Sequence, residues 1–213
     1  MASLKKLLKA KPGTSRGSNP TRAVIGLRNP GSDYEGTRHN SGYEALARVL
    51  DRAGEKLGRG PSRVRAQVTQ VGSGESRLLY AVPMTYMNES GRAVRALLDY
   101  FGLDPQAILV VHDDIDLPFG RLRLQVGGGA GGNNGVRSIE SALGTRDFSR
   151  LKIGVGRPPG QMDPADYVLR PFTKAERAEV ELILEDAADV IELWPTDPAQ
   201  AQERAALRGR EHS

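Results

Sequence analysis

Cysteine is absent from the sequence, which excludes disulfide bridges, thiolate metal sites, iron–sulfur clusters and cysteine nucleophiles. Aromatic residues are scarce at 5%, and histidine occurs three times. No apolar run approaches the roughly 20 residues that cross a bilayer. Glycine is abundant instead, with 25 of 213 residues. A chain of this length fits one domain, at roughly 100–200 residues per domain. We expect a cytoplasmic protein with no membrane partner.

Charge is nearly balanced over the whole chain, with 30 Lys and Arg against 26 Asp and Glu, a net charge of +4. The distribution is uneven, because residues 1–20 carry cations but no acid. This composition predicts a basic, disordered extension over 1–20, with a transit peptide as the alternative. The folded body is expected over 21–194, and the polar residues 195–213 are expected to form a tail.

Short apolar runs alternate with segments of helical periodicity along the folded body. The run 107–111 is continuously apolar, which is typical of a strand buried on both faces. Thr173 and Glu176 have the spacing of a capping box before the last helix. The expected strands cover 23–27, 65–71, 78–82, 107–111, 120–126 and 151–155, and the expected helices cover 41–53, 90–101, 136–143 and 173–193. This alternation predicts an α/β fold, a single-domain three-layer α/β/α sandwich with a mostly parallel mixed sheet.

A histidine and an aspartate are the strongest candidates for chemistry. His39 stands before a predicted helix, and Asp113 follows the buried run 107–111, so it lies at the carboxyl end of a strand. An aspartate that holds one imidazole nitrogen makes the other nitrogen a general base. Because the chain has no cysteine and no serine in a nucleophile elbow, that base would activate water. Surface or helix-capping roles for both residues are the alternative.

Three asparagines, Asn29, Asn88 and Asn134, stand beside glycines or at helix starts. Asparagine in such places commonly caps a helix or occupies a left-handed turn. Three of them at the mouths of three elements would instead suit a substrate rich in amides, or an oxyanion hole. We predict no metal, because no histidine pair has ligand spacing and the aspartates from Asp113 onward lack the glycine and glutamate of a calcium loop.

The segment 127–132 matches the pattern G-x-G-x-x-G between a strand and a helix, which raises an alternative function as a nucleotide-dependent oxidoreductase. A run so rich in glycine also matches by chance, and the pattern normally follows the first strand of its fold. The firmer inference is that these glycines let a large ligand approach the backbone. Arg121, Arg123 and Lys152 lie on strands beside this loop and form either a phosphate clamp or a solvated edge.

Taken together, four segments resemble the bacterial peptidyl-tRNA hydrolase family over about residues 23–193. They read GLRNPGSDYEGTRHNSG, PMTYMNESG, HDDIDLPFGRLRL and GGGAGGNNGVRSI, beginning at residues 26, 83, 112 and 127. The resemblance implies hydrolysis of the ester between a peptide and the 3′ end of tRNA, which recycles the tRNA without any cofactor. We expect no protein partner and a monomer, because the apolar faces in the sequence are those that the sheet needs.

The resemblance also assigns roles around the ester. His39 would draw a proton from water, Asp113 would orient the imidazole, and Asn88 would position the water or the developing oxyanion. Asn29 and Asn134 would contact the peptide backbone. Asn29 would in addition help to distinguish peptidyl from free aminoacyl esters.

On the tRNA side, the resemblance places Tyr34 and Tyr86 beside the 3′ end. Arg123 and Lys152 would contact phosphates. A lysine that is common two residues before the glycine loop is Gln125 in this chain, so only part of the family's 5′-phosphate clamp is kept.

The glycine loop departs from the family pattern, which commonly reads G-G-G-H-G-G-H-N-G, since Ala130 and Asn133 replace both histidines. Arg28 stands where a small residue is usual. A changed loop and a basic extension would also suit a non-catalytic RNA-binding relative, such as the intron-splicing factor of plant organelles. The intact His39 and Asp113 favour the hydrolase. The Pro-rich segment 157–171 is expected to be a surface loop, either a lid or a static connection.

Overall fold

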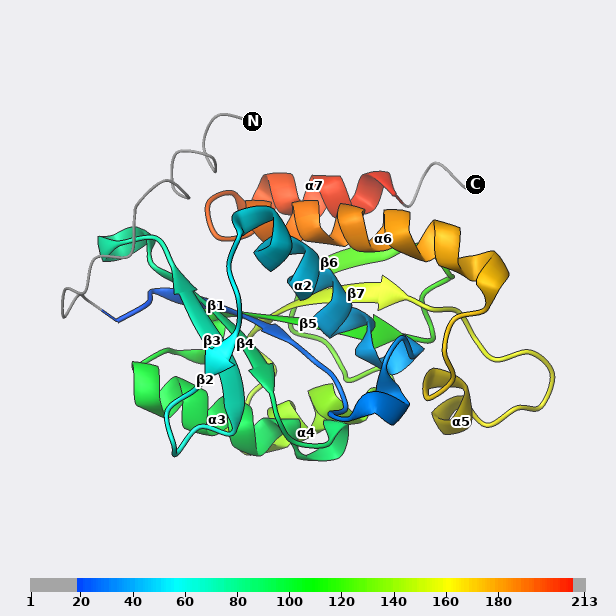
Figure 1. Ribbon diagram of the computed structural model, residues 1–213, viewed down its shortest axis with the longest axis horizontal. Coiled ribbons are helices and arrows are strands. Elements are labelled where there is room, and N and C mark those ends of the chain that lie inside the picture. The colour runs from blue at the N-terminus through cyan, green and yellow to red at the C-terminus, as the bar shows by residue number, and fades with distance from the viewer. Residues whose placement is uncertain (1–18, 209–213) are drawn as a thin grey trace.

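A seven-stranded sheet forms the middle layer of the protein in a computed structural model that describes residues 19–208 (Figure 1). The strands span Arg22–Gly26 (β1), Gly58–Arg59 (β2), Ala66–Val71 (β3), Leu78–Pro83 (β4), Ile108–Asp114 (β5), Leu122–Val126 (β6) and Ser149–Gly154 (β7). Their order in the sheet is β2-β3-β4-β1-β5-β7-β6. The central strands β4, β1, β5 and β7 run parallel, and the pairs at both edges are antiparallel.

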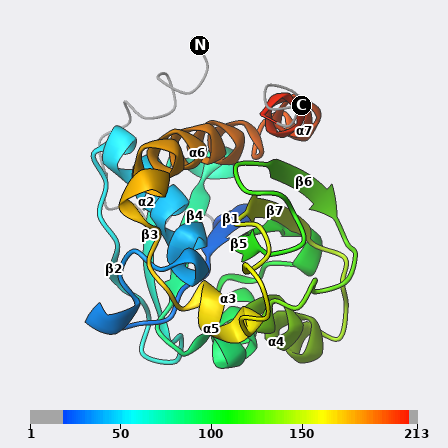
Figure 2. The same ribbon diagram turned by 90° about the vertical axis from the view of Figure 1, so that its right-hand side faces the viewer.

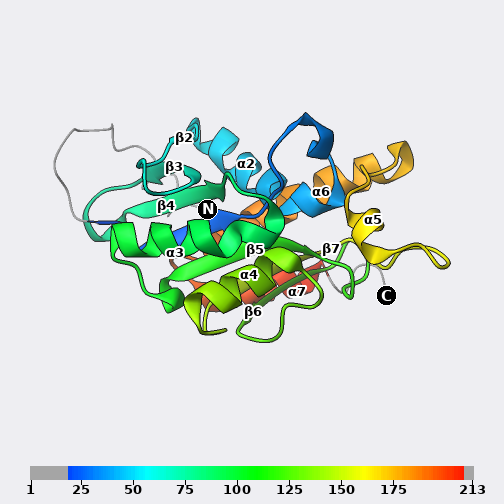
Figure 3. The ribbon, with the colours of Figure 1, turned by 90° about the horizontal axis from the view of Figure 1, so that it is seen from below.

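Helices cover both faces of this sheet (Figures 2 and 3). They span Ser41–Ala53 (α2), Ser90–Phe101 (α3), Asn134–Leu143 (α4), Pro164–Val168 (α5), Lys174–Leu193 (α6) and Pro198–Leu207 (α7). Helices α2 and α6 lie on one face, and α3 and α4 lie on the other. All residues of β5 are buried, and Leu109 and Val110 belong to the cores on opposite faces. The predicted three-layer α/β/α sandwich is confirmed.

The long elements lie where the apolar pattern predicts them, within a few residues at each end. The capping box is also present, because the Thr173 side chain accepts from the backbone N–H of Glu176 and the Glu176 carboxylate accepts from Thr173 N–H. Three short elements, β2, α5 and α7, are absent from the prediction. The first has only two residues, and the other two lie in segments whose polar or Pro-rich composition favours loops.

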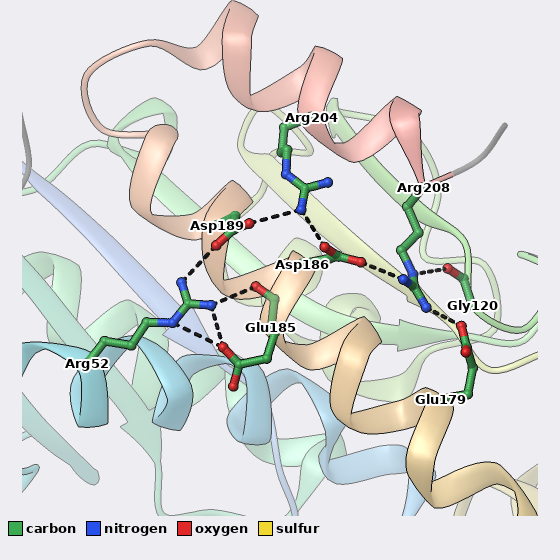
Figure 4. Close-up of polar contacts among 8 residues, drawn as sticks. All are labelled: Arg52, Gly120, Glu179, Glu185, Asp186, Asp189, Arg204 and Arg208. Atoms are coloured by element: carbon green, nitrogen blue, oxygen red, sulfur yellow. Dashed lines mark hydrogen bonds and ion pairs between the residues drawn. The ribbon is translucent and has the colours of Figure 1, made fainter. Parts of the chain in front are cut away.

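The predicted boundary at residue 194 is wrong, because α7 belongs to the folded body. Small residues explain the error: Ala201 and Ala205 are fully buried against α6, and alanines four residues apart make a weak hydrophobic signal. Ion pairs hold α7 in place as well (Figure 4). They join Arg204 to Asp186 and Asp189, and Arg208 to Asp186 and Glu179. Arg208 also donates a hydrogen bond to the backbone oxygen of Gly120.

The end of the Pro-rich segment 157–171 is attached to the turn Arg38–Asn40 by Arg38. This buried arginine donates to the backbone oxygens of Arg170 at 3.2 Å and Pro171 at 2.9 Å. It also pairs with Glu176 at 2.8 Å and packs against the ring of Tyr167. The segment therefore forms a wall fixed beside the turn that carries His39; movement as a lid stays a prediction.

No helix within residues 19–208 is long and apolar enough to cross a bilayer. The predicted basic extension falls mainly on residues 1–18, which, like 209–213, lie outside the described part of the chain.

Candidate active site

A pocket of about 710 Å³ opens where β1, β4 and β5 end and where α2 and α4 begin. It brings together the five residues that the sequence singles out for the ester: Asn29, His39, Asn88, Asp113 and Asn134. The glycine loop forms one wall of the pocket, and α5 with its flanking residues forms another.

The His39 imidazole lies against the Asp113 carboxylate at the floor of this pocket. Nδ1 of His39 is 2.8 Å from Oδ1 of Asp113, and both side chains are buried. Gly42 permits this approach, because a Cβ there would overlap the carbonyl oxygen of Val111, so α2 begins directly over β5. An ionised carboxylate only accepts hydrogen bonds, so Nδ1 carries the hydrogen and the lone pair lies on Nε2.

The environment of His39 makes it more basic than a free histidine. Burial would lower the pKa of His39, but the charge of Asp113 and the hydrogen bond to it outweigh burial and raise the pKa above 6.5. The neighbouring His112 is different: burial lowers its pKa, and its Nδ1 bonds to the backbone oxygen of Asp113. His112 does not line the pocket. The geometry therefore distinguishes one candidate base from the other.

The side-chain oxygen of Asn29 is already hydrogen-bonded within the protein, whereas its side-chain nitrogen is not. Its Oδ1 accepts from the backbone N–H of Met87 at 2.8 Å, which fixes the amide orientation. Its backbone N–H donates to Oδ1 of Asn40 at 2.8 Å, and Asn40 returns a bond to the Asn29 carbonyl at 3.1 Å. The Nδ2 of Asn29 bonds to no residue within 19–208 and is the end left to the pocket.

The other two asparagines are exposed at the pocket rim. Asn88 lies in the turn Met87–Glu89, and Asn134 is the first residue of α4, where its Oδ1 accepts from Arg137 at 3.3 Å. Neither they nor Asn29 occupies a left-handed turn, because every described residue with positive φ is a glycine. The predicted alternative of left-handed turn positions is therefore wrong, and their amides remain available to a ligand.

Two tyrosines stand together at the mouth of the pocket. Tyr86 lines it and is 56% exposed. The half-buried Tyr34 meets it edge to face, with ring centroids 6.4 Å apart. An exposed ring at the entrance offers a surface on which a base can stack.

The two cations predicted for tRNA binding lie outside the pocket. Arg123 is exposed on the edge strand β6, directly opposite Lys152 on β7. The Lys152 ammonium is 2.8 Å from the Asp114 carboxylate, and its side chain is only 12% exposed. Gly131 of the glycine loop lies close to this pair. Gln125 bonds to the backbone oxygen of Gly127 and so belongs to the loop's own structure.

The glycine loop does not have the context of a dinucleotide fingerprint. That pattern joins parallel neighbours in a β–α–β unit, whereas the loop here follows β6, which is antiparallel to β7 at the edge of the sheet. Arg150, fully buried, holds the loop by donating to the backbone oxygen of Gly129 at 2.9 Å and pairing with Glu140 at 2.8 Å. The nucleotide-dependent oxidoreductase therefore has no structural support.

The structure adds pocket residues that the sequence pattern does not single out. Asn133, noted only as a departure from the family loop, contacts Asp113 directly. Asn40, which does not itself line the pocket, supports Asn29. Residues 163–169 form a wall, and Arg38 bonds to the backbone of Arg170 directly after it. The signal for Asn133 was its place just before a predicted helix, which suits an N-cap. Within residues 19–208 no three His, Asp or Glu side chains converge as a metal site.

Comparisons with known proteins agree with this geometry. A family model described as "Peptidyl-tRNA hydrolase" matches residues 23–212. The peptidyl-tRNA hydrolase of Frankia alni is 49% identical over 187 residues, 86% of this chain and 94% of its own. That of Mycobacterium tuberculosis is 51% identical over 170 residues, 80% and 88% of the two chains.

Solved structures are similar as well. The crystal structure of peptidyl-tRNA hydrolase from Acinetobacter baumannii superposes with a TM-score of 0.79 at 33% identity, covering 90% of this chain and 96% of its own. The family match spans nearly the whole described chain, α7 included, and the sequence relatives are identical at about half of the aligned positions. This chain belongs to the peptidyl-tRNA hydrolase family.

Proposed function

We propose that this protein hydrolyses the ester between a peptide and the 3′ end of tRNA, with His39 as general base. The observation that carries the proposal is the 2.8 Å contact of His39 Nδ1 with Asp113 Oδ1 at the floor of a pocket walled by asparagines. The family relatives, which carry the name of this activity, support it.

The reaction requires no group beyond water and these side chains. Nε2 of His39 takes a proton from a water molecule, whose oxygen attacks the ester carbonyl. Asp113 stabilises the imidazolium that forms. The Asn88 amide donates to the oxyanion of the tetrahedral intermediate. When the C–O bond to the ribose breaks, the imidazolium returns its proton to the leaving ribose oxygen, and the products are a peptide carboxylic acid and a free tRNA 3′ hydroxyl.

The bonding of Asn29 explains a preference for blocked esters. Its Oδ1 is engaged by Met87, so only N–H donors face the pocket. A peptide or an acetyl group offers a carbonyl oxygen to these donors. The α-ammonium of a free aminoacyl ester offers only further donors, so it would leave the Asn29 amide unpaired. Asn134 offers a second amide for the peptide backbone at the pocket rim.

The tRNA end is proposed to lie across the tyrosines and the cations near the glycine loop. Tyr86, supported by Tyr34, offers a stacking surface to the terminal bases. Arg123 is exposed and contacts phosphate directly, without reading sequence. Lys152 has three N–H donors, so it can share them between Asp114 and a phosphate.

We further propose that the protein acts in the cytoplasm as a monomer and needs no protein partner. One chain supplies every wall of the pocket, which supports a site complete in a single copy.

The test is single-turnover hydrolysis of an N-acetyl-aminoacyl-tRNA, with the unblocked aminoacyl-tRNA in parallel. Wild type is expected to release the acetylated amino acid, and His39→Ala is expected to slow release by at least about 100-fold, the scale of a lost general base. Both proteins should bind the tRNA equally. If wild type binds the tRNA but releases nothing, the chain is a non-catalytic RNA-binding relative and the proposal fails.

A further inference from the structure

Asn133 is a buried side chain with two different sets of partners. It is the N-cap of α4, and its Oδ1 accepts from the backbone N–H groups of Gly135 at 3.0 Å and Val136 at 3.1 Å. Its Nδ2 donates to Asp113, reaching Oδ1 at 2.8 Å and the backbone oxygen at 3.2 Å. Only 6% of the residue is exposed.

These partners leave only one orientation for the amide. A flipped side chain would turn N–H against the two N–H groups of α4 and oxygen against the Asp113 carboxylate. Gly135 allows this close packing, because a Cβ there would lie 3.2 Å from Oδ1 of Asn133 and would overlap Met87. The cap and the contact with Asp113 are therefore made by one rigid group.

The contact falls on the same oxygen that His39 uses. Oδ1 of Asp113 lies 2.8 Å from Nδ1 of His39 and 2.8 Å from Nδ2 of Asn133. A carboxylate oxygen with donors on both lone pairs cannot rotate without breaking one of the bonds. Lys152 and the Asp116 and Leu117 N–H groups bond to the next carboxylate, Asp114, and do not restrain Asp113.

We propose that Asn133 is a positioning residue for the hydrolysis: it fixes the Asp113 carboxylate, and through it the His39 imidazole, to the start of α4. The inference rests on the proposed function, since it concerns the base of that reaction. Asn133 also connects the two sides of the pocket, the His39 side and the α4 side, because α4 begins with Asn134. The base, from the turn Arg38–Asn40 just before α2, and the peptide-binding amide at the start of α4 are thereby held in fixed relative positions.

Serine separates the two tasks of Asn133. Ser is an N-cap of about the same quality as Asn, but its hydroxyl is attached one bond closer to the backbone and does not reach Asp113. Asn133→Ser therefore keeps the cap and loses the contact. Asn133→Ala loses both. Asp197→Ala is the matched control, because Asp197 caps α7 through Gln200 N–H, on the opposite face of the sheet from α4.

The measurements are thermal unfolding and the kinetics of N-acetyl-aminoacyl-tRNA hydrolysis against pH. Asn133→Ser is expected to unfold within about 2 °C of wild type, whereas both alanine variants unfold about 3 °C lower. Asn133→Ser and Asn133→Ala should lower kcat about tenfold with KM within twofold, the scale of one hydrogen bond to a charged group. Asp197→Ala should keep wild-type kcat.

The pH dependence of kcat/KM distinguishes a positioning role from a capping role, because loss of the cap alone would not shift it. Without the Nδ2 donor, more of the negative charge of Asp113 acts on His39, so the acid limb of kcat/KM is expected to shift to higher pH. An Asn133→Ser enzyme with wild-type kcat and an unmoved acid limb would overturn the proposal and leave Asn133 as a cap only. A wild type without hydrolytic activity, or an active His39→Ala, would instead refute the proposed function.

Discussion

Replacing Asn29 with aspartate tests how the pocket recognises a blocked amino group. The change is nearly isosteric, so one carboxylate oxygen can still accept from Met87 N–H. The other oxygen replaces the Nδ2 donors that face the pocket. The pocket then presents an acceptor where the wild type presents a donor, and the preference between the two esters should move toward the free α-ammonium.

The size of the effect follows from the two bonds exchanged. Losing the donor to the acyl carbonyl destabilises the transition state for the blocked ester by about 1 kcal/mol, the contribution of a typical net hydrogen bond. Gaining a charge-assisted bond to the ammonium stabilises the transition state for the free ester by about 2 kcal/mol. The ratio of the two kcat/KM values should therefore shift by about 3 kcal/mol, or roughly 150-fold.

The assay compares kcat/KM for N-acetyl-aminoacyl-tRNA and for the same tRNA with a free amino group. Asn29→Ala is the control, because it removes the donors without adding charge: it should slow the blocked ester and leave the free ester unimproved. If Asn29→Asp keeps the wild-type ratio, the Asn29 amide does not contact the acyl group and the reasoning from its bonding is refuted.

Three further results are expected, two from His39 and one from Arg38. Because the pKa of His39 is raised above 6.5, kcat/KM should rise with pH through a midpoint above 6.5; a midpoint below 6.5 would contradict the role of Asp113. The same raised pKa stabilises the fold below pH 6.5 and loses its effect as pH rises through the folded value, so wild type should exceed His39→Ala in unfolding temperature more at pH 6 than at pH 9. Arg38→Leu removes the bonds to the backbone oxygens of Arg170 and Pro171 and the pair with Glu176. Calorimetry should find about 3 kcal/mol less stability, or about 9 °C, and kinetics should find a raised KM. The exposed Arg95, whose pair with Asp99 lies on one helix face, is the control, and Arg95→Leu should change stability by less than about 1 kcal/mol.

The fold could be predicted from the sequence because its signals are local and strong. The first four residues of β5, 108–111, are all apolar, which is typical of a strand covered on both faces. The capping box at Thr173 marks the start of α6 through backbone chemistry that needs no tertiary contact. The short helices α5 and α7 escaped prediction because tertiary contacts, such as those of Arg38 and Arg208, hold them.

The contact between His39 and Asp113 could be predicted because strand ends meet at one edge of a parallel sheet, which places Asp113 near the helix start that follows β1. The contact of Asn133 with Asp113 could not be predicted, because the two residues lie twenty positions apart and only the folded chain brings them together. The other end of the Asn133 amide bonds locally, to Gly135 two residues away. The ion pair of Lys152 with Asp114 could not be predicted from the sequence either. Its partner Asp114 follows Asp113 directly, yet their carboxylates have different partners, Asp114 pairing with Lys152 and Asp113 with His39.

Arg204 and Arg208, in and directly after α7, limit how far the chain can be shortened from its C-terminal end. A shortened version ending at residue 194, where the polar composition invites a cut, would deprive Asp186 of both guanidinium partners and uncover the surface of α6 under Ala201 and Ala205. It would also release the backbone oxygen of Gly120, which Arg208 holds at 3.2 Å at the entry to β6. The smallest autonomous unit for expression or crystallisation therefore ends no earlier than Arg208.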